Sequence, residues 1–462
     1  MASETRPGSP LDRILRLAAD VRSGEGLTAV LLGLNVFLIL MAYYVLKPVR
    51  EALILSEGSA AQKTYLSVVQ VFLLALIVPV YGRLVRKMNR RRLINTVTGF
   101  FVVTLVAFYA LGQSGARLGV PFFLWISIFN LMVVAQFWSF ANDLYSKDEG
   151  ERLFPIIGFG ASLGAVVGAG LAGGFIERIG VFELMLVGAV LLVVEVLLTN
   201  YIDSREASRS RQTTAQPRVA SSKRGAFGLV LRTRYLLLIA LMLMLGNIVN
   251  TTGEFLLGRT VQESAVREVG ANDAEGVQRT IGSFYSTFYA SVNIVGLLLQ
   301  LFVVSRIVRV FGVHIAVLVL PLVSLGAYGI IAFAPILRAV FVGKVGENAT
   351  DYSLNNTVRN MLFLPCTTEQ KYSAKQAIDS FFVRVGDVGA AAIVFVGTTW
   401  LSLSTSAFAI VNALLVLLWL GVAWRIGRDY RSLSITGSTP ASTVQADTVA
   451  KVSPSASPAA IP

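Results

Sequence analysis

Segment 351–390 carries charged and amide side chains between long apolar runs, so it would itself lie largely within a membrane. A single charge at the bilayer centre costs about 2.5–3.5 kcal/mol, and such residues therefore face a bundle interior or a wet cavity. Its two predicted helices contain one arginine each, Arg359 and Arg384, and a guanidinium can bind a phosphate or carboxylate through two hydrogen bonds. The other polar residues include Asp351, Asn355, Asn356, Asn360, Asp379 and Asp387. This composition predicts the wall of a pathway for an anionic solute.

Two more basic residues, Lys47 and Arg50, follow the first apolar run. They are three residues apart, so they can face the same side of a helix. With Arg359 and Arg384 they would form a basic cluster for phosphate groups. The alternative is that Lys47 and Arg50 extend their charged ends to water at a membrane face. We predict substrate binding for all four residues, with Asn355 as a neutral ligand beside them.

Acidic residues inside apolar runs are candidates for substrate contact, coupling or gating. Glu254 follows amide and hydroxyl residues in one span, so it would face a cavity or form a structural ion pair with a base such as Lys47. Glu195 lies deep in another span and would either couple transport to protons or accept hydrogen bonds from a neighbouring helix, which is the commoner behaviour. Asp387 lies three residues after Arg384, which allows the two to pair.

Two further patterns have competing interpretations. Phe137 and Trp138 could stack on a nucleobase while Asn142 bonds its edge, or the aromatic pair could serve packing and interface anchoring. Gly160, Gly164 and Gly168 recur at four-residue spacing. Small residues in this pattern predict close helix packing, not phosphate binding.

Composition excludes several classes of protein. Of 462 residues, 55% are hydrophobic and 15% are charged, against roughly 25% charged in soluble domains. The net charge of +13 arises from loops between apolar runs, which indicates a membrane orientation signal and not nucleic-acid binding. With one cysteine, one histidine and no Walker-type sequence, we expect no metal site, no cofactor, no intrachain disulfide and no enzyme.

Hydropathy predicts an all-α polytopic membrane protein of about twelve spans in two parallel halves of six. The basic loops alternate with neutral or acidic ones, which puts both termini in the cytoplasm. The predicted organisation is an N-terminal tail over 1–26, a first half over 27–202, a basic linker over 203–229, a second half over 230–426 and a disordered tail over 427–462. The predicted spans are 27–46, 64–81, 93–111, 120–144, 154–176, 181–202, 235–257, 281–304, 313–333, 337–363, 374–396 and 408–426.

The two halves also resemble each other, since the basic loop GRLVRKMNRRR (82–92) has a weaker counterpart in SRIVRVFG (305–312). This layout resembles the major facilitator superfamily, which implies a substrate site between the halves near the midplane. The first loop is similar to that superfamily's glycine-plus-basic loop motif, with Arg86 where an acid is favoured and Asn89 where glycine is favoured.

Three stretches carry a narrower resemblance. YYVLKPVREALIL (43–55), FWSFANDLYSKDEGERLFPIIGFGASLG (137–164) and segment 351–390 resemble the ATP/ADP antiporter family, the nucleotide transporters of plastids and obligate intracellular bacteria. They lie in the first predicted span, between the fourth and fifth, and between the tenth and eleventh. The resemblance implies nucleotide exchange across a membrane by a divergent bacterial member of that family.

That family has four charged residues important to exchange. The lysine of its first span falls on Lys47, the acid of its seventh on Glu254 and the lysine of its tenth on Arg359. The acid of its fourth span has no counterpart within 125–130.

We therefore predict a secondary active transporter in a bacterial inner membrane, moving a nucleotide or related phosphorylated metabolite by exchange or with protons. It would bind one small anionic substrate and act as a monomer in the bilayer. The absent fourth-span acid favours an alternative, a facilitator permease or exporter of another organic anion. A membrane receptor or scaffold without transport is the alternative from another class.

Overall fold

A computed structural model of the chain describes residues 20–22, 24–145, 147–206, 226–366, 370 and 374–436. Within these ranges all regular secondary structure is helical, which confirms the predicted fold class. The long helices are α2 (Gly26–Glu57), α3 (Ala60–Lys87), α4 (Arg90–Gln113), α5 (Gly119–Leu144), α6 (Lys147–Ile179), α7 (Glu183–Glu206), α9 (Arg234–Val269), α10 (Ala274–Leu298), α12 (Val313–Phe333) and α17 (Thr405–Thr436). Shorter α-helices are α8 (Ala226–Arg232), α11 (Val304–Phe311), α13 (Leu337–Thr350), α14 (Asn356–Met361), α15 (Lys375–Ala377) and α16 (Val383–Phe395), and π-helical segments are η2 (Leu299–Val303), η3 (Asp351–Asn355), η5 (Ile378–Phe382) and η6 (Val396–Trp400).

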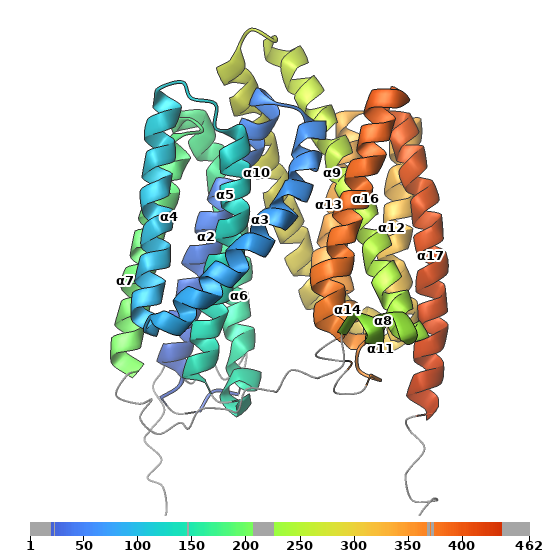
Figure 1. Cartoon of the computed structure of the whole chain (residues 1–462), viewed down its shortest axis with the longest axis horizontal. Helices are drawn as coiled ribbons and strands as arrows, with labels where there is room; N and C mark the ends of the chain where they lie inside the picture. Colours follow the sequence, from blue (N-terminus) through green and yellow to red (C-terminus); the bar gives the residue numbers. More distant parts are fainter. Residues whose placement is uncertain are drawn as a thin grey trace, which may run out of the picture.

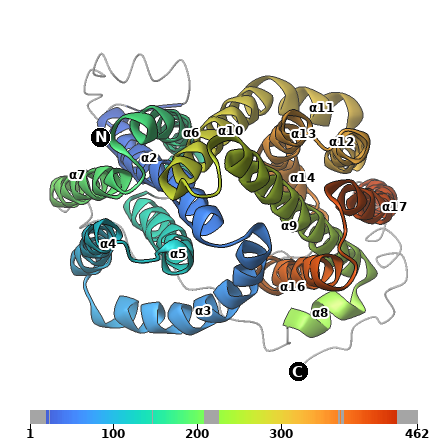
Figure 2. The same ribbon diagram turned by 90° about the horizontal axis from the view of Figure 1, so that it is seen from above.

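The helices form two groups that lie side by side, α2–α7 and α8–α17 (Figure 1). One cluster of buried apolar side chains lies within the first group, and a second lies mostly within the other. Two helices connect the groups: α3 packs on α9 and α16, and α10 packs on α2 and α6 (Figure 2). The groups therefore meet through α3 and α10.

The two ends of the molecule differ. Helix α2 begins and α17 ends at the lower end in Figure 1, where the basic segments 82–92 and 305–312 also lie. We call this the basic end. At the upper end α2, α3, α9 and α10 come together, and Gln262 on α9 donates to the carbonyls of Leu55 and Gly58 at 2.8 and 2.9 Å. We call this the closed end, because hydrogen bonds join the two groups there.

The structure corrects the predicted loops at the basic end. Only two residues separate α3 from α4, and α11 covers most of the predicted loop 305–312. Arginine and lysine are good helix formers, and their long stems can cover apolar surface while the charge reaches water. Helix α17 likewise continues to Thr436, although disorder was predicted from residue 427. Parts of three predicted segments lie outside the described residues: 437–462 of this tail, 1–19 and 23 of the N-terminal tail, and 207–225 of the linker.

Eleven helices in the described ranges are long and apolar enough to cross a membrane, one fewer than the number of predicted spans. The predicted span that does not meet this criterion of length and hydropathy is the tenth. Its backbone is helical from Leu337 to Met361, but η3 interrupts the α-helical hydrogen bonding between α13 and α14. The segment is too polar for a lipid-facing helix because it buries Lys344, Glu347 and Asn348, each at most 5% exposed. The residues that weaken its hydropathy belong to the site described below.

The glycine pattern of α6 packs as predicted. A Cβ added at Gly160, Gly164 or Gly168 would lie 2.3–2.4 Å from a backbone carbonyl oxygen of α2. Only glycine permits this approach, so the four-residue spacing places α6 directly against the backbone of α2.

We expect Gly164→Ala to destabilise the protein. Its new Cβ would meet the carbonyl oxygen of Phe37 at 2.3 Å, and overpacking of this kind typically costs about 1–3 kcal/mol. Gly170→Ala, on the same helix with nothing within 4 Å of the new Cβ, is the matched control. In thermal unfolding the first variant should lose several degrees of Tm and the control none. Equal Tm values for both variants would show that the helices can separate without cost.

Candidate functional site

A network of buried charges joins the two groups near the closed end. Its first part centres on Glu51 of α2, which is fully buried. Lys63 on α3 places Nζ 2.6 Å from Oε2 of Glu51, and Arg50 Nε donates to Oε1 at 3.1 Å. The hydroxyl of Tyr289 on α10 donates to the same Oε1 at 3.1 Å. Glu51 thus binds partners from three helices, one of them in the opposite group.

The second part of the network centres on Glu254 of α9. Nζ of Lys344 on α13 lies 3.6 Å from Oε1 of Glu254 and 3.0 Å from Oε2 of Glu347. Asn348 donates to Oε1 of Glu254 at 3.0 Å. Nζ of Lys63 lies 3.9 Å from Oε2 of Glu254. Lys63 therefore connects the two parts across the boundary between the groups.

Lys47 lies on α2 one turn nearer the basic end. It is 8% exposed, and its Nζ lies 3.9 Å from the ring centre of Tyr289 and 5.0 Å from that of Tyr44. Such cation–π contacts stabilise a cation by about 0.5–2 kcal/mol but leave its charge in place. Within the described residues Lys47 forms no ion pair, whereas Lys63 and Lys344 each do.

We call these seven residues the charge cluster. Its members are Lys47, Arg50, Glu51, Lys63, Glu254, Lys344 and Glu347. With every member ionised, four cations face three carboxylates, so one positive charge is unbalanced. A buried unbalanced charge is costly, and a bound anion would remove the imbalance. The cluster can therefore hold an anionic group next to Lys47.

A cavity of about 420 Å³ lies next to the cluster on the side of the basic end. Leu40 and Tyr44 on α2, Ala165 on α6 and Asn293 on α10 line it, so both groups contribute. Small-molecule sites usually occupy about 300–1,000 Å³, so the cavity has room for a metabolite.

The structure brings three predicted site residues together: Lys47, Arg50 and Glu254 all belong to the charge cluster. The side chain of Arg50 is 14% exposed, so neither basic residue extends to water at a membrane face as the alternative required. The alternative prediction for Glu254, an ion pair with a base of the other half, is met by Lys63 of α3 and not by Lys47, the example given. Glu254 also pairs with Lys344, which reaches it from α13.

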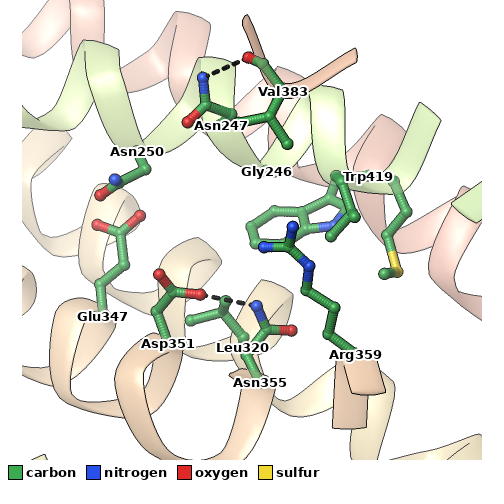
Figure 3. A pocket seen from close by; sticks show the side chains of 12 residues that line it. Gly246, Asn247, Asn250, Leu320, Glu347, Asp351, Asn355, Arg359, Val383 and Trp419 are labelled. Carbon is green, nitrogen blue, oxygen red and sulfur yellow. Dashed lines mark hydrogen bonds between the residues drawn. The ribbon is translucent and has the colours of Figure 1, made fainter. Parts of the chain in front are cut away.

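Arg359 and Asn355 are not members of the cluster but line a neighbouring pocket within the second group, to which Glu347 of the cluster also contributes (Figure 3). Arg359 points toward Trp419 and forms an ion pair with Asp379, while Asn355 donates to Asp351 at 2.7 Å. The pocket encloses about 80 Å³, well below the roughly 300 Å³ of the smallest usual ligand sites. It is too small for a nucleotide in this conformation.

Arg384 and Asp387 form the predicted pair at 3.0 Å on α16. Asp387 also accepts hydrogen bonds from Asn247 at 2.7 Å and Thr251 at 3.3 Å. These contacts join α16 to α9. Asp387 therefore has a complete set of partners without a substrate.

Glu195 accepts hydrogen bonds from Thr199 at 2.7 Å and from Asn35 of α2 at 3.2 Å, which confirms the predicted contact with a neighbouring helix. The predicted nucleobase contacts are not assembled: Phe137 is 3% exposed in the core beside Glu195, and Asn142 is exposed at the basic end of α5. The aromatic pair therefore serves packing, the alternative considered above.

We expect Glu195→Gln to keep the fold and Glu195→Leu to weaken it. Glutamine retains the oxygen that Thr199 and Asn35 bind, whereas leucine removes the acceptor of the buried Thr199 hydroxyl, at a cost of about 1–3 kcal/mol. Asn35 would keep its hydrogen bonds to the Thr199 hydroxyl and to the backbone carbonyl of residue 195. Thermal unfolding compares the two variants. A glutamine variant as unstable as the leucine variant would show that the fold requires the carboxylate itself.

Sequence reasoning missed four members of the cluster: Glu51, Lys63, Lys344 and Glu347. A signal was available for the last two, because a lysine and a glutamate three residues apart within an apolar span can pair on one helix face. A signal for Glu51 was its position in the first-span stretch 43–55, directly after the predicted site residue Arg50.

The fold and the cluster define a polytopic helical membrane protein with a buried charged site between two helical groups, the architecture of a secondary transporter. The chain belongs to the Major Facilitator Superfamily, which it matches over residues 32–362.

Its relatives are named as nucleotide carriers. It is 24% identical to ADP,ATP carrier protein 1 of Chlamydia muridarum over 77% of this chain and 70% of that protein. It is 26% identical to ADP,ATP carrier protein 2 of Chlamydia trachomatis over 66% and 64%, and 23% identical to the plastidic ATP/ADP-transporter of Solanum tuberosum over 87% and 73%.

Solved structures share the fold. The nucleoside transporter NupG superposes with a TM-score of 0.60 at 11% identity, covering 88% of this chain and 98% of that one. A POT family transporter in complex with 5-aminolevulinic acid reaches 0.63 at 11% identity, covering 86% and 96%. At these identities the likeness concerns the fold alone.

Proposed function

We propose that the protein is a secondary active transporter that moves a nucleotide, or a related phosphorylated metabolite, by alternating access. The names of its relatives support a nucleotide as the substrate. The observation that carries the proposal is Lys47, a buried cation without a carboxylate partner among the described residues, beside a cavity of about 420 Å³ between the two groups. A phosphate group would balance its charge.

Alternating access would use the asymmetry of the two ends. The groups are joined at the closed end by the ion pair of Lys63 with Glu254 and by the hydrogen bond from Tyr289 to Glu51, whereas the cavity lies toward the basic end. A phosphate at Lys47 adds a negative charge beside this network and would compete with the carboxylates for its cations. We propose that this competition loosens the closed end and lets the groups rock around the site.

Orientation and organisation follow from charge. We propose that the basic end faces the cytoplasm of a bacterium, with the protein in the inner membrane and both termini inside, because basic segments are retained on that side. The transporting unit would be a monomer whose halves span 27–202 and 230–426.

Arg359 is a second candidate phosphate ligand, since a phosphate in its pocket would replace Asp379 as the ion-pair partner of Arg359. The secondary candidates for binding or coupling are Arg384, Asn142, Glu195 and Asp387.

Counterflow in liposomes tests the proposal. Purified protein is reconstituted into vesicles loaded with millimolar ATP, and uptake of labelled ADP is measured against empty vesicles and vesicles loaded with citrate. We expect uptake that depends on internal nucleotide. Equal uptake into citrate-loaded and nucleotide-loaded vesicles would overturn the nucleotide assignment, and no uptake with any anion would overturn transport.

Transport of another organic anion is the second candidate, and one observation favours it. The stretch where the ATP/ADP antiporters have their fourth-span acid is occupied by aromatic packing. Trp125 stacks on Phe122 and Phe129 with ring centres 5.5 and 5.7 Å apart and donates to Thr104 at 2.9 Å. The citrate-loaded vesicles of the same assay distinguish this candidate.

A further inference from the structure

The cavity beside Lys47 differs in chemistry from the charge cluster. No described side chain that lines it is charged. Its polar lining consists of two tyrosines, three amides and two hydroxyls, of which Tyr44, Asn293, Gln300, Tyr352 and Asn356 are large enough to reach a ligand. A phosphate moved into this cavity would lose its hydration without gaining a cation, which is strongly unfavourable. The cavity therefore fits a neutral group that forms hydrogen bonds.

The cavity and Lys47 are adjacent. Tyr44 lines the cavity, and its ring centre lies 5.0 Å from Nζ of Lys47. The two residues are one helical turn apart on α2, so they share a face. One ligand can thus contact Lys47 with one end and occupy the cavity with the other.

Two of the lining residues lie on segments that depart from α-helical geometry. Gln300 belongs to η2, Tyr352 belongs to η3, and these π-helical segments contact each other. Widened turns of this kind are rare and frequently occur at functional sites. Both side chains are exposed to the cavity region and not packed into a core, which leaves them available to a ligand.

We infer that this cavity is the subsite for the nucleobase and ribose of a nucleotide whose phosphates bind at Lys47. The inference rests on the proposed function. Tyrosine rings can stack on a planar base, and amides offer both a donor and an acceptor to its edge. The substrate would then lie along α2, with its charged end toward the closed end and its neutral end toward the basic end.

Binding of two ligands tests the inference: ATP, and tripolyphosphate as the same anion without base or ribose. Both are titrated against the purified full-length protein by calorimetry. The wild type should bind ATP about 5- to 150-fold more tightly than tripolyphosphate, because the base can stack on an aromatic side chain. Tyr352→Ala and Gln300→Ala should each weaken ATP binding and leave tripolyphosphate binding within about twofold. Tyr201→Ala, an exposed tyrosine on α7, is the matched control.

Each outcome has one meaning. Selective loss of ATP affinity in both variants supports the subsite. Equal affinity of the wild type for ATP and tripolyphosphate, or equal losses for both ligands in folded Tyr352→Ala and Gln300→Ala, would overturn it and leave the proposed function standing. Absence of binding of either ligand to the folded wild type would overturn the proposed function itself.

Discussion

A disulfide across the closed end is expected to abolish transport, and a reductant should restore it. A Cβ added at Gly258 on α9 would lie 3.3 Å from the Cβ of Ala60 on α3, close to the roughly 3.5–4.5 Å found in disulfides. The chain has one cysteine of its own, Cys366, so Ala60→Cys with Gly258→Cys in a Cys366→Ala background gives one defined pair. Exchange in liposomes is measured after a lipid-soluble oxidant and again after a reductant.

The expected loss follows from alternating access. The pair joins α3 of the first group to α9 of the second, so a covalent bond there prevents the closed end from opening. The matched control is Ala327→Cys with Gly343→Cys, which joins α12 and α13 within one group, with the added Cβ 3.0 Å from that of Ala327. Full exchange in the oxidised Ala60–Gly258 pair, with cross-linking shown on a gel, would mean that the groups do not separate at this end.

Removing the charge of Lys47 is expected to weaken nucleotide binding by about 10- to 100-fold. A hydrogen bond to a charged group is worth about 1.5–3 kcal/mol, which corresponds to that range. Lys47→Met keeps an apolar stem against Tyr44 and Tyr289, so the fold should be retained. Calorimetric titration with ATP measures the effect, and Lys47→Arg should recover part of the affinity.

Lys87→Met provides the control for charge. Lys87 is exposed at the end of α3, so the same substitution removes the same charge away from the cluster. Its ATP affinity should equal that of the wild type. A Lys47→Met protein that binds ATP as tightly as the wild type would exclude Lys47 as the phosphate ligand and make Arg359 the next candidate.

The sequence predicts the helices well and their partners poorly. Span 313–333 was predicted with the bounds that α12 has, because a continuous apolar run without charges has only one interpretation. The tenth span has the opposite character: its buried Lys344 and Glu347 lower its hydropathy, and both belong to the site although sequence reasoning missed them. The same residues that obscure a helix in a hydropathy profile thus indicate its function.

The charge cluster shows why the remaining contacts could not be predicted. Lys63 lies just outside the predicted second span, where a basic residue is usually an interface charge. Its role comes from Glu51 and Glu254, which are close to it only because α2, α3 and α9 meet at the closed end. Hydropathy gives the length and order of helices, but which helices meet depends on tertiary packing.

Thermal stabilisation of the purified protein by ATP, ADP, GTP, inorganic phosphate and citrate tests most directly whether nucleotides bind at Lys47. A ligand present at 100 times its dissociation constant should stabilise the folded state by about 2.7 kcal/mol. Binding of nucleotides at Lys47 predicts a rise in Tm with the nucleotides that is lost in Lys47→Met and kept in Lys87→Met. A rise with citrate alone, or a nucleotide effect unchanged in Lys47→Met, would contradict it.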